Sequence, residues 1–277
     1  NVTLNTSATI NSSSTFLVAS AGTPAAITVA GSVLGASDGV GTVQITNTGG
    51  TTFSGTVGNT ANTLALINID QDTTFSGSVE ATNINNAAST TATFSDNVTA
   101  TITNSGTLLF NATDAKSVTG TIAEAAGGDT TEVQVINSAN GEAPSVVTFT
   151  GTVVAGTLTI GTTTYGGAAL FEEAVTTPTI NVVGGDHADE DSTATFNKAV
   201  TASSGITLND QTGDAKVIFA ANNSVTITGT IDGASSDEGT IQVTGATKTF
   251  SGAIGTTQAL TLIDIDNTST FNEAISA

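Results

Sequence analysis

Residues 52–58 read TFSGTVG, and almost the same seven residues return as TFSGSVE at 74–80 and as TFSGAIG at 249–255. Eight of the 11 phenylalanines begin the same five-residue pattern. The phenylalanine is followed by three mostly small or polar residues, and the fifth residue is valine or isoleucine. Three further patterns begin with an aliphatic residue. Successive patterns start about 24 residues apart on average, a spacing typical of solenoid repeats. The predicted core residues are therefore Val29, Phe53, Phe75, Phe94, Val118, Phe149, Phe171, Phe196, Ile227, Phe250 and Phe271.

A longer period includes about four of these short units. GTVQITN at 41–47 returns as TEVQVIN at 131–137 and as GTIQVTG at 239–245. The 16 residues 64–79, LALINIDQDTTFSGSV, likewise match residues 260–275, LTLIDIDNTSTFNEAI. Two nested periods indicate one repetitive domain over residues 1–277, built of about three longer modules.

The residues between the patterns alternate as in β-strands. In GTVQIT, Val43 and Ile45 share one face while threonine and glutamine take the other. Glycine, asparagine, aspartate and serine supply turns, and no helical periodicity is sustained. We therefore expect an all-β fold, a parallel, right-handed β-solenoid (β-helix) of about twelve coils, with the phenylalanine rings stacked inside. An antiparallel β-sandwich is the alternative, although sandwiches seldom repeat their sequence.

Charge and hydropathy exclude several partners. The formal net charge is −20, and the four basic residues are all lysines. Such a chain lacks the cations that nucleic-acid phosphates and anionic lipids require. No apolar run approaches the roughly 20 residues of a membrane-spanning helix, so we expect no transmembrane segment.

The two ends of the sequence read as one continuous repeat. FNEAISA at 271–277 followed by NVTLN at 1–5 resembles the internal stretch FNKAVTASSGITLN at 196–209. This continuity predicts either a window of a longer array or copies that stack head to tail into a filament, fibre, layer or stalk.

One acidic stretch, GGDHADEDST at 184–193, contains the only histidine, His187. Crowded carboxylates suit Ca²⁺, which takes six to eight oxygen ligands. The spacing matches neither the EF-hand loop nor the calcium-binding nonapeptide repeat. A solvated charged loop is the other interpretation, in which His187 is a surface residue. The candidate calcium ligands are Asp186, Asp189, Glu190 and Asp191.

A second set of carboxylates precedes two phenylalanines of the pattern: Asp70, Asp72, Asp264 and Asp266. Asp70 and Asp266 lie at matched positions, five residues before Phe75 and Phe271. Paired carboxylates can cleave glycosides, yet here they belong to a repeated motif. Turn formation or loose calcium binding explains them better. We therefore expect no catalytic residues, no enzyme activity and no cofactor other than calcium.

The phrases TFSGTV, TFNKAVTA and GTVQI resemble the β-strand-repeat surface proteins of Gram-negative bacteria. That group includes autotransporter and adhesin passengers, rickettsial-type surface antigens and S-layer-like proteins. The resemblance covers essentially the whole chain and implies an extracellular or cell-surface location. The expected function is a structural protein that self-assembles into a surface filament or layer. An adhesin stalk that binds cell-surface glycans is the first alternative, and a polysaccharide-active β-helix enzyme is the second.

Overall fold

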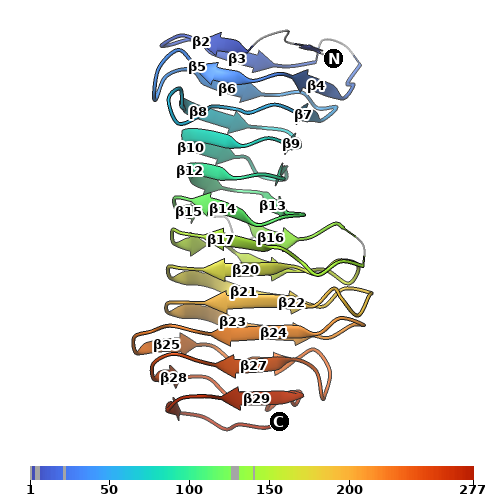
Figure 1. The fold of residues 1–277 in the computed structure, drawn as a ribbon, viewed down its shortest axis with the longest axis vertical. Coiled ribbons are helices and arrows are strands. Elements are labelled where there is room, and N and C mark those ends of the chain that lie inside the picture. The colour runs from blue at the N-terminus through green and yellow to red at the C-terminus, as the bar shows by residue number, and fades with distance from the viewer. Residues whose placement is uncertain (1, 4–6, 21–22, 126–130, 140) are drawn as a thin grey trace. The chain divides into compact units, whose positions relative to one another are not determined.

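The computed structural model describes residues 2–3, 7–20, 23–125, 131–139 and 141–277. Strands, turns and loops make up these residues, which include no helix and hence no helical membrane span. Parallel strands stack into a β-solenoid of about 11 turns, close to the twelve coils predicted (Figure 1). The class of fold is thereby confirmed.

Contacts between residues divide the chain into two compact units. The first unit contains residues 1–111 and 117–131, and the second contains residues 112–116 and 132–277. The single domain of three modules stays a prediction.

The strands of the first unit pair in parallel as three stacks. The first stack contains β3 (Thr15–Val18), β6 (Thr42–Ile45), β8 (Leu64–Ile69), β10 (Val79–Asn86), β12 (Val98–Asn104) and β15 (Ile122–Glu124). The second contains β1 (Val2–Thr3), β4 (Ile27–Ala30), β7 (Thr51–Phe53), β9 (Thr73–Phe75), β11 (Thr91–Phe94) and β13 (Thr107–Asn111). The third contains β2 (Ala8–Ile10), β5 (Val33–Gly35), a bridge at Val57, the first parts of β10 and β12, and β14 (Lys116–Thr119).

The second unit repeats this arrangement. Its first stack contains β16 (Glu132–Ile136), β19 (Thr157–Ile160), β21 (Val175–Val183), β23 (Val200–Asn209) and β26 (Ile231–Gly233), then bridges at Ile254 and Ile275. Its second contains β17 (Val146–Phe149), β20 (Ala168–Phe171), β22 (Ser192–Phe196), β24 (Ala215–Phe219), β27 (Thr240–Val243) and β29 (Leu262–Ile265). Its third contains β18 (Val153–Val154), the first parts of β21 and β23, β25 (Val225–Thr228), β28 (Lys248–Phe250) and β30 (Ser269–Phe271).

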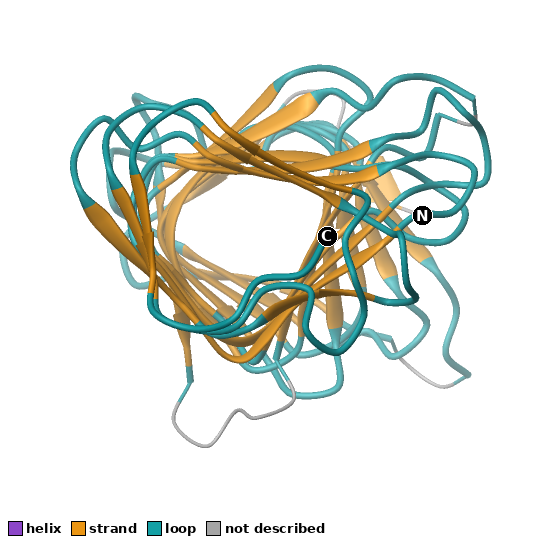
Figure 2. Cartoon of the chain, turned by 90° about the horizontal axis from the view of Figure 1, so that it is seen from below, coloured by secondary structure: helices purple, strands orange, loops and turns teal. Residues whose placement is uncertain are grey.

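Alternation along each strand separates the interior from the surface. In β12 the side chains of Val98, Ala100 and Ile102 are buried, and those of Thr99 and Thr101 are exposed. Branching at Cβ suits valine, isoleucine and threonine to the pleated strand, so the same residue types that form the strand also fill or coat it. Figure 2, a view turned by 90°, shows strands forming the sides of the coils and loops forming the corners.

Phenylalanine rings stack inside each unit. In the first unit the ring centroids of Phe53, Phe75 and Phe94 lie 5.2 Å apart in succession, with nearly parallel planes. In the second unit Phe171 lies 4.9 Å from Phe149 and 5.1 Å from Phe196. Of the predicted core residues, Phe271 is half-buried and the others are buried. Each ring therefore contacts the ring of the neighbouring coil, at a spacing set by the strand repeat.

Two of the predicted pattern starts, Val118 and Ile227, pair with the valine that closes the pattern of the preceding coil. Val118 pairs with Val98 and not with Phe94, whose partner is Phe110. Ile227 likewise pairs with Val200, while the partner of Phe196 is Phe219. In both coils the valine or isoleucine follows its phenylalanine by eight residues instead of four, because the corner loop is longer. Both side chains are buried. Ile227 pairs in turn with Phe250 of the next coil, and Phe250 pairs with Phe271, so these two phenylalanines continue the column of Ile227.

One lysine is part of the core. Lys248 is fully buried, and its Nζ donates hydrogen bonds to the carbonyl oxygens of Ala221 (2.8 Å), Thr244 (3.1 Å) and Ala246. Burial lowers the pKa of the Lys248 ammonium group, because the charged form is poorly solvated there. The three carbonyl groups supply the hydrogen bonds that water would otherwise make.

Candidate functional sites

The acidic stretch predicted as a calcium site forms a corner loop between β21 and β22, residues 184–191. Its backbone closes on itself, because Gly185 N–H donates to the Glu190 carbonyl oxygen (2.9 Å) and Glu190 N–H donates to that of His187 (3.1 Å). The loop is also fixed to the next coil, where Gly213 N–H donates to the carbonyl oxygen of Gly185 (3.0 Å). These bonds join the two ends of the loop and connect the loop to the next coil.

Glu190 is fully buried within this corner. Its Oε1 accepts a hydrogen bond from Gly141 N–H (2.7 Å), and Oε2 accepts a longer one from His187 N–H (3.3 Å). A Cβ atom added at Gly166 or Gly213 would lie 2.6 or 2.5 Å from the Glu190 carbonyl oxygen. The corner thus admits only glycine at these two positions, and the backbone packs directly against Glu190.

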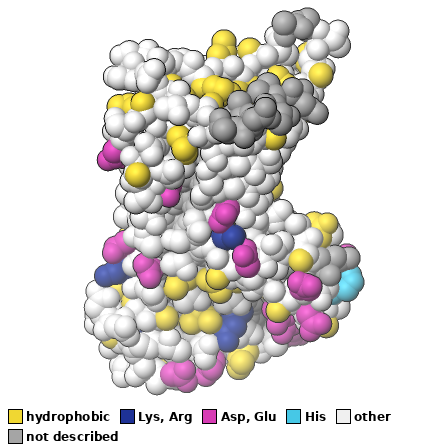
Figure 3. Space-filling view, turned by 45° about the horizontal axis from the view of Figure 1, so that its top comes forward, with side chains coloured by type: hydrophobic (Ala, Val, Ile, Leu, Met, Phe, Trp, Pro, Cys, Tyr) yellow, Lys and Arg dark blue, Asp and Glu magenta, His cyan; other side chains and the backbone are white. Residues whose placement is uncertain are grey.

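Asp186 and His187 lie at the rim of the same loop, with about half of each side chain exposed. His187 Nδ1 lies 2.8 Å from Asp186 Oδ1 and 3.7 Å from Glu190 Oε2. The hydrogen bond to Asp186 is the main cause that raises the pKa of His187. Burial acts against it, and the charges of Asp186, Glu190 and Asp189 act in the same direction as the hydrogen bond. In Figure 3 acidic side chains gather beside the histidine.

The structure therefore brings together only part of the predicted calcium set. Asp186 and Glu190 converge with His187, within 4.8 Å of one another by their ligand atoms. Asp189 is exposed and outside this group. Asp191 Oδ1 accepts a hydrogen bond from Asp214 N–H (2.8 Å) of the next coil. Sequence reasoning treated His187 as a surface residue, and its position beside Asp186 was the available signal for a ligand role.

Several loop carboxylates bind backbone N–H groups of a neighbouring coil. Asp210 Oδ2 accepts from Gly239 N–H (2.8 Å), and Asp232 Oδ1 accepts from Thr257 N–H (3.0 Å). These side chains satisfy donors that the loops leave outside the strand ladders. Burial, followed by the charges of Asp191 and Asp210, raises the pKa of Asp214. Much of the acidic character of the corners thus serves to join successive coils.

Three carboxylates of the second predicted set accept hydrogen bonds from neighbouring coils. Asp70 Oδ2 accepts a hydrogen bond from Gln44 Nε2 (2.6 Å), and Asp72 Oδ1 accepts one from Thr91 N–H (2.8 Å). Asp264 Oδ2 accepts one from Gln242 Nε2 (3.3 Å). Asp70 and Asp72 belong to the first unit, whereas Asp264 and Asp266 belong to the second. In the part of the chain that the structure describes, one group of three or more candidate metal ligands is found, and it is the group around His187.

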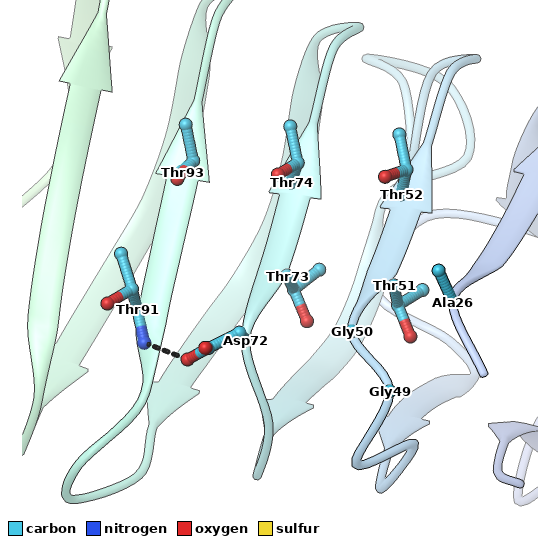
Figure 4. Close-up of a pocket in the computed structure, with 10 residues that line it drawn as sticks. All are labelled: Ala26, Gly49, Gly50, Thr51, Thr52, Asp72, Thr73, Thr74, Thr91 and Thr93. Atoms are coloured by element: carbon cyan, nitrogen blue, oxygen red, sulfur yellow. Dashed lines mark hydrogen bonds between the residues drawn. The ribbon is translucent and has the colours of Figure 1, made fainter. Parts of the chain in front are cut away.

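A groove crosses β7, β9 and β11 on the outer face of the first unit (Figure 4). Thr52, Thr74 and Thr93 are register partners on these three strands, and their side chains project in the same direction. The Asp72 carboxylate lines the same groove next to Thr91, whose N–H group donates a hydrogen bond to it. Thr51 also lines the groove, and its buried Oγ1 has no hydrogen-bond partner. This row of hydroxyl groups was not singled out from the sequence.

A comparison of the chain with protein-family models, with curated proteins and with solved structures finds no match. The chain is thus defined by its fold as a β-solenoid repeat protein, and its resemblance to bacterial surface proteins remains a prediction.

Proposed function

We propose that this chain is a non-catalytic structural protein of the bacterial cell surface, whose copies associate head to tail into a filament or layer. The proposed location is extracellular, on a Gram-negative bacterium, as the sequence resemblance implies. Strands of one copy would continue the parallel stacks of the next copy, so that the assembly repeats the contacts within the chain.

The main support for this proposal is that apolar side chains are exposed in the coil formed by residues 260–275. Ile265 is 42% exposed, although its register partner Val243 in the preceding coil is fully buried. Ile275 is 46% exposed, whereas its partner Ile254 is 1% exposed. These side chains continue interior columns of the preceding coils. Covering them would remove apolar surface from water, and each buried side chain would contribute about 1.5–3 kcal/mol.

The proposed contact avoids strong repulsion despite the large negative charge of the chain. Residues 1–37, which include β2, β3 and β4, contain no charged side chain. A coil of this stretch can approach the coil of residues 260–275 without opposing a carboxylate to the carboxylates of Asp264 and Asp266.

Self-association is tested by placing charges on the exposed apolar side. We expect the wild-type chain to form assemblies in electron micrographs and in sedimentation velocity. The double variant Ile265→Glu with Ile275→Glu should instead sediment as a 27.2 kDa monomer, because a carboxylate buried against apolar side chains is strongly unfavourable. Val146→Glu is the matched control, since Val146 is 42% exposed on β17. It should assemble like the wild type.

A wild-type chain that stays monomeric at high concentration would contradict the proposal, as would a double variant that assembles normally. Circular dichroism of each variant shows whether the fold is retained.

The threonine groove favours a second function, that of an adhesin stalk. Hydroxyl groups repeated at the strand spacing of about 4.8 Å offer donors and acceptors to an extended glycan. Asp72 would add an acceptor in the same groove. This function would be favoured over assembly if the wild-type chain were monomeric and bound cell-surface glycans, and if the Thr74→Val variant no longer bound them.

A further inference from the structure

We propose that Asp186, His187 and Glu190 bind one divalent transition-metal ion of the zinc class. The ligand atoms would be Asp186 Oδ1, His187 Nδ1 and Glu190 Oε2. The inference concerns a site in the second unit and does not depend on head-to-tail assembly. It differs from the calcium prediction in its ion and in its ligands, because His187 enters the set and Asp189 and Asp191 leave it.

The distances between the three ligand atoms fit a small ion. In a tetrahedral zinc site with bonds of about 2.0–2.1 Å, neighbouring ligand atoms lie about 3.3–3.4 Å apart. His187 Nδ1 lies 2.8 Å from Asp186 Oδ1 and 3.7 Å from Glu190 Oε2. All three atoms lie within 4.8 Å of one another. Small side-chain rotations of Asp186 and His187, which are half-exposed, would bring each atom to its bonding distance.

Glu190 gives the site a fixed ligand. Its buried carboxylate is oriented through Oε1 by the N–H group of Gly141, which leaves Oε2 toward His187. The backbone at Gly166, Gly185 and Gly213 packs so closely that a Cβ atom at any of them would collide with Glu190. A ligand held in this way loses little conformational freedom when an ion binds.

The rim of the site gives an ion access and a favourable charge. Half of the Asp186 side chain and half of the His187 side chain are in contact with solvent, so water can complete the coordination shell. Asp189 and Asp191 add two carboxylates in the same loop. An imidazole nitrogen suits Zn²⁺, Co²⁺ or Ni²⁺, whereas Ca²⁺ takes oxygen ligands.

The test is a titration of the full chain with Zn²⁺, followed by calorimetry and by NMR of the histidine ring. The chain has one histidine, so the ring signals report on this loop alone. We expect saturable binding of one ion, a shift of the His187 ring signals at constant pH and no displacement by excess Ca²⁺. Asp186→Asn and His187→Asn should each weaken binding by about 10-fold or more.

Asp189→Asn is the matched control, because it removes one negative charge from the same loop and leaves the three ligands in place. It should change the affinity for Zn²⁺ by less than about 3-fold, an effect of charge alone at an exposed position. Equal losses in Asp186→Asn and Asp189→Asn would show attraction by the charged loop and overturn the proposal. An unshifted His187 ring, or displacement of Zn²⁺ by Ca²⁺, would overturn it as well.

Discussion

Phe171→Ala is expected to lower the free energy of unfolding by about 3–5 kcal/mol, as for large core truncations in general. The ring of Phe171 is fully buried between the rings of Phe149 and Phe196. Its removal would leave a cavity in the middle of the column, and both neighbours would lose a stacking partner. Urea unfolding followed by circular dichroism measures the change.

Val146→Ala is the control for Phe171→Ala, because Val146 lies on the adjacent strand β17 and is 42% exposed. This substitution should change the free energy of unfolding by no more than about 0.5 kcal/mol. Similar losses for the two variants would mean that Phe171 is not an interior residue, contrary to the stacked coils.

Gly58→Ala is expected to cost more than about 2 kcal/mol, because two effects add. Gly58 has a φ of +75°, which disfavours any residue with a Cβ atom. In addition, a Cβ atom there would overlap the carbonyl oxygen of Glu80 in the next coil. The coils cannot separate locally without breaking strand hydrogen bonds, such as that from Glu80 N–H to the Val57 carbonyl oxygen (2.8 Å).

Gly39→Ala separates the two effects. Gly39 also has a positive φ, +68°, but the nearest atom to its added Cβ is Thr82 Oγ1 at 3.9 Å. This control should therefore lose about 1 kcal/mol, the cost of backbone strain alone. Thermal unfolding of both variants provides the comparison. If Gly58→Ala lost no more than Gly39→Ala, the close approach of successive coils at this corner would be contradicted.

The recurring phenylalanine pattern was sufficient to predict the parallel solenoid and most of its interior column. It missed Phe110 and Phe219 because the fourth residue after each is polar, Asp114 and Asn223. The longer corner loops at these coils move the next inward residue by four positions. A search for a pattern of fixed length cannot detect such an insertion. The pairing of neighbouring strands in the structure reveals it, because Phe94 pairs with Phe110 and Phe196 pairs with Phe219.

The candidate metal ligands were only partly predictable for a different reason. The burial of Glu190 depends on Gly141, Gly166 and Gly213, which come from other coils. Nothing in the local stretch GGDHADED distinguishes Glu190 from the exposed Asp189. The acidic residue types were enough to indicate the loop as a candidate metal site. Which carboxylate lies beside His187 depends on how the corner loops of successive coils pack against one another.

Parallel pairing of successive coils is tested most directly by disulfide cross-linking, since the chain has no cysteine of its own. Glu80 pairs with Thr99, and Asn85 pairs with Thr103, on β10 and β12. Cysteines introduced at either pair should form a disulfide on mild oxidation, because adjacent strands lie about 4.8 Å apart and a disulfide spans about 4.4–6.8 Å between Cα atoms. Cysteines at Glu80 with Thr103, or at Asn85 with Thr99, should remain reduced. Disulfides in these last two combinations and not in the first two would show antiparallel strands and contradict the solenoid.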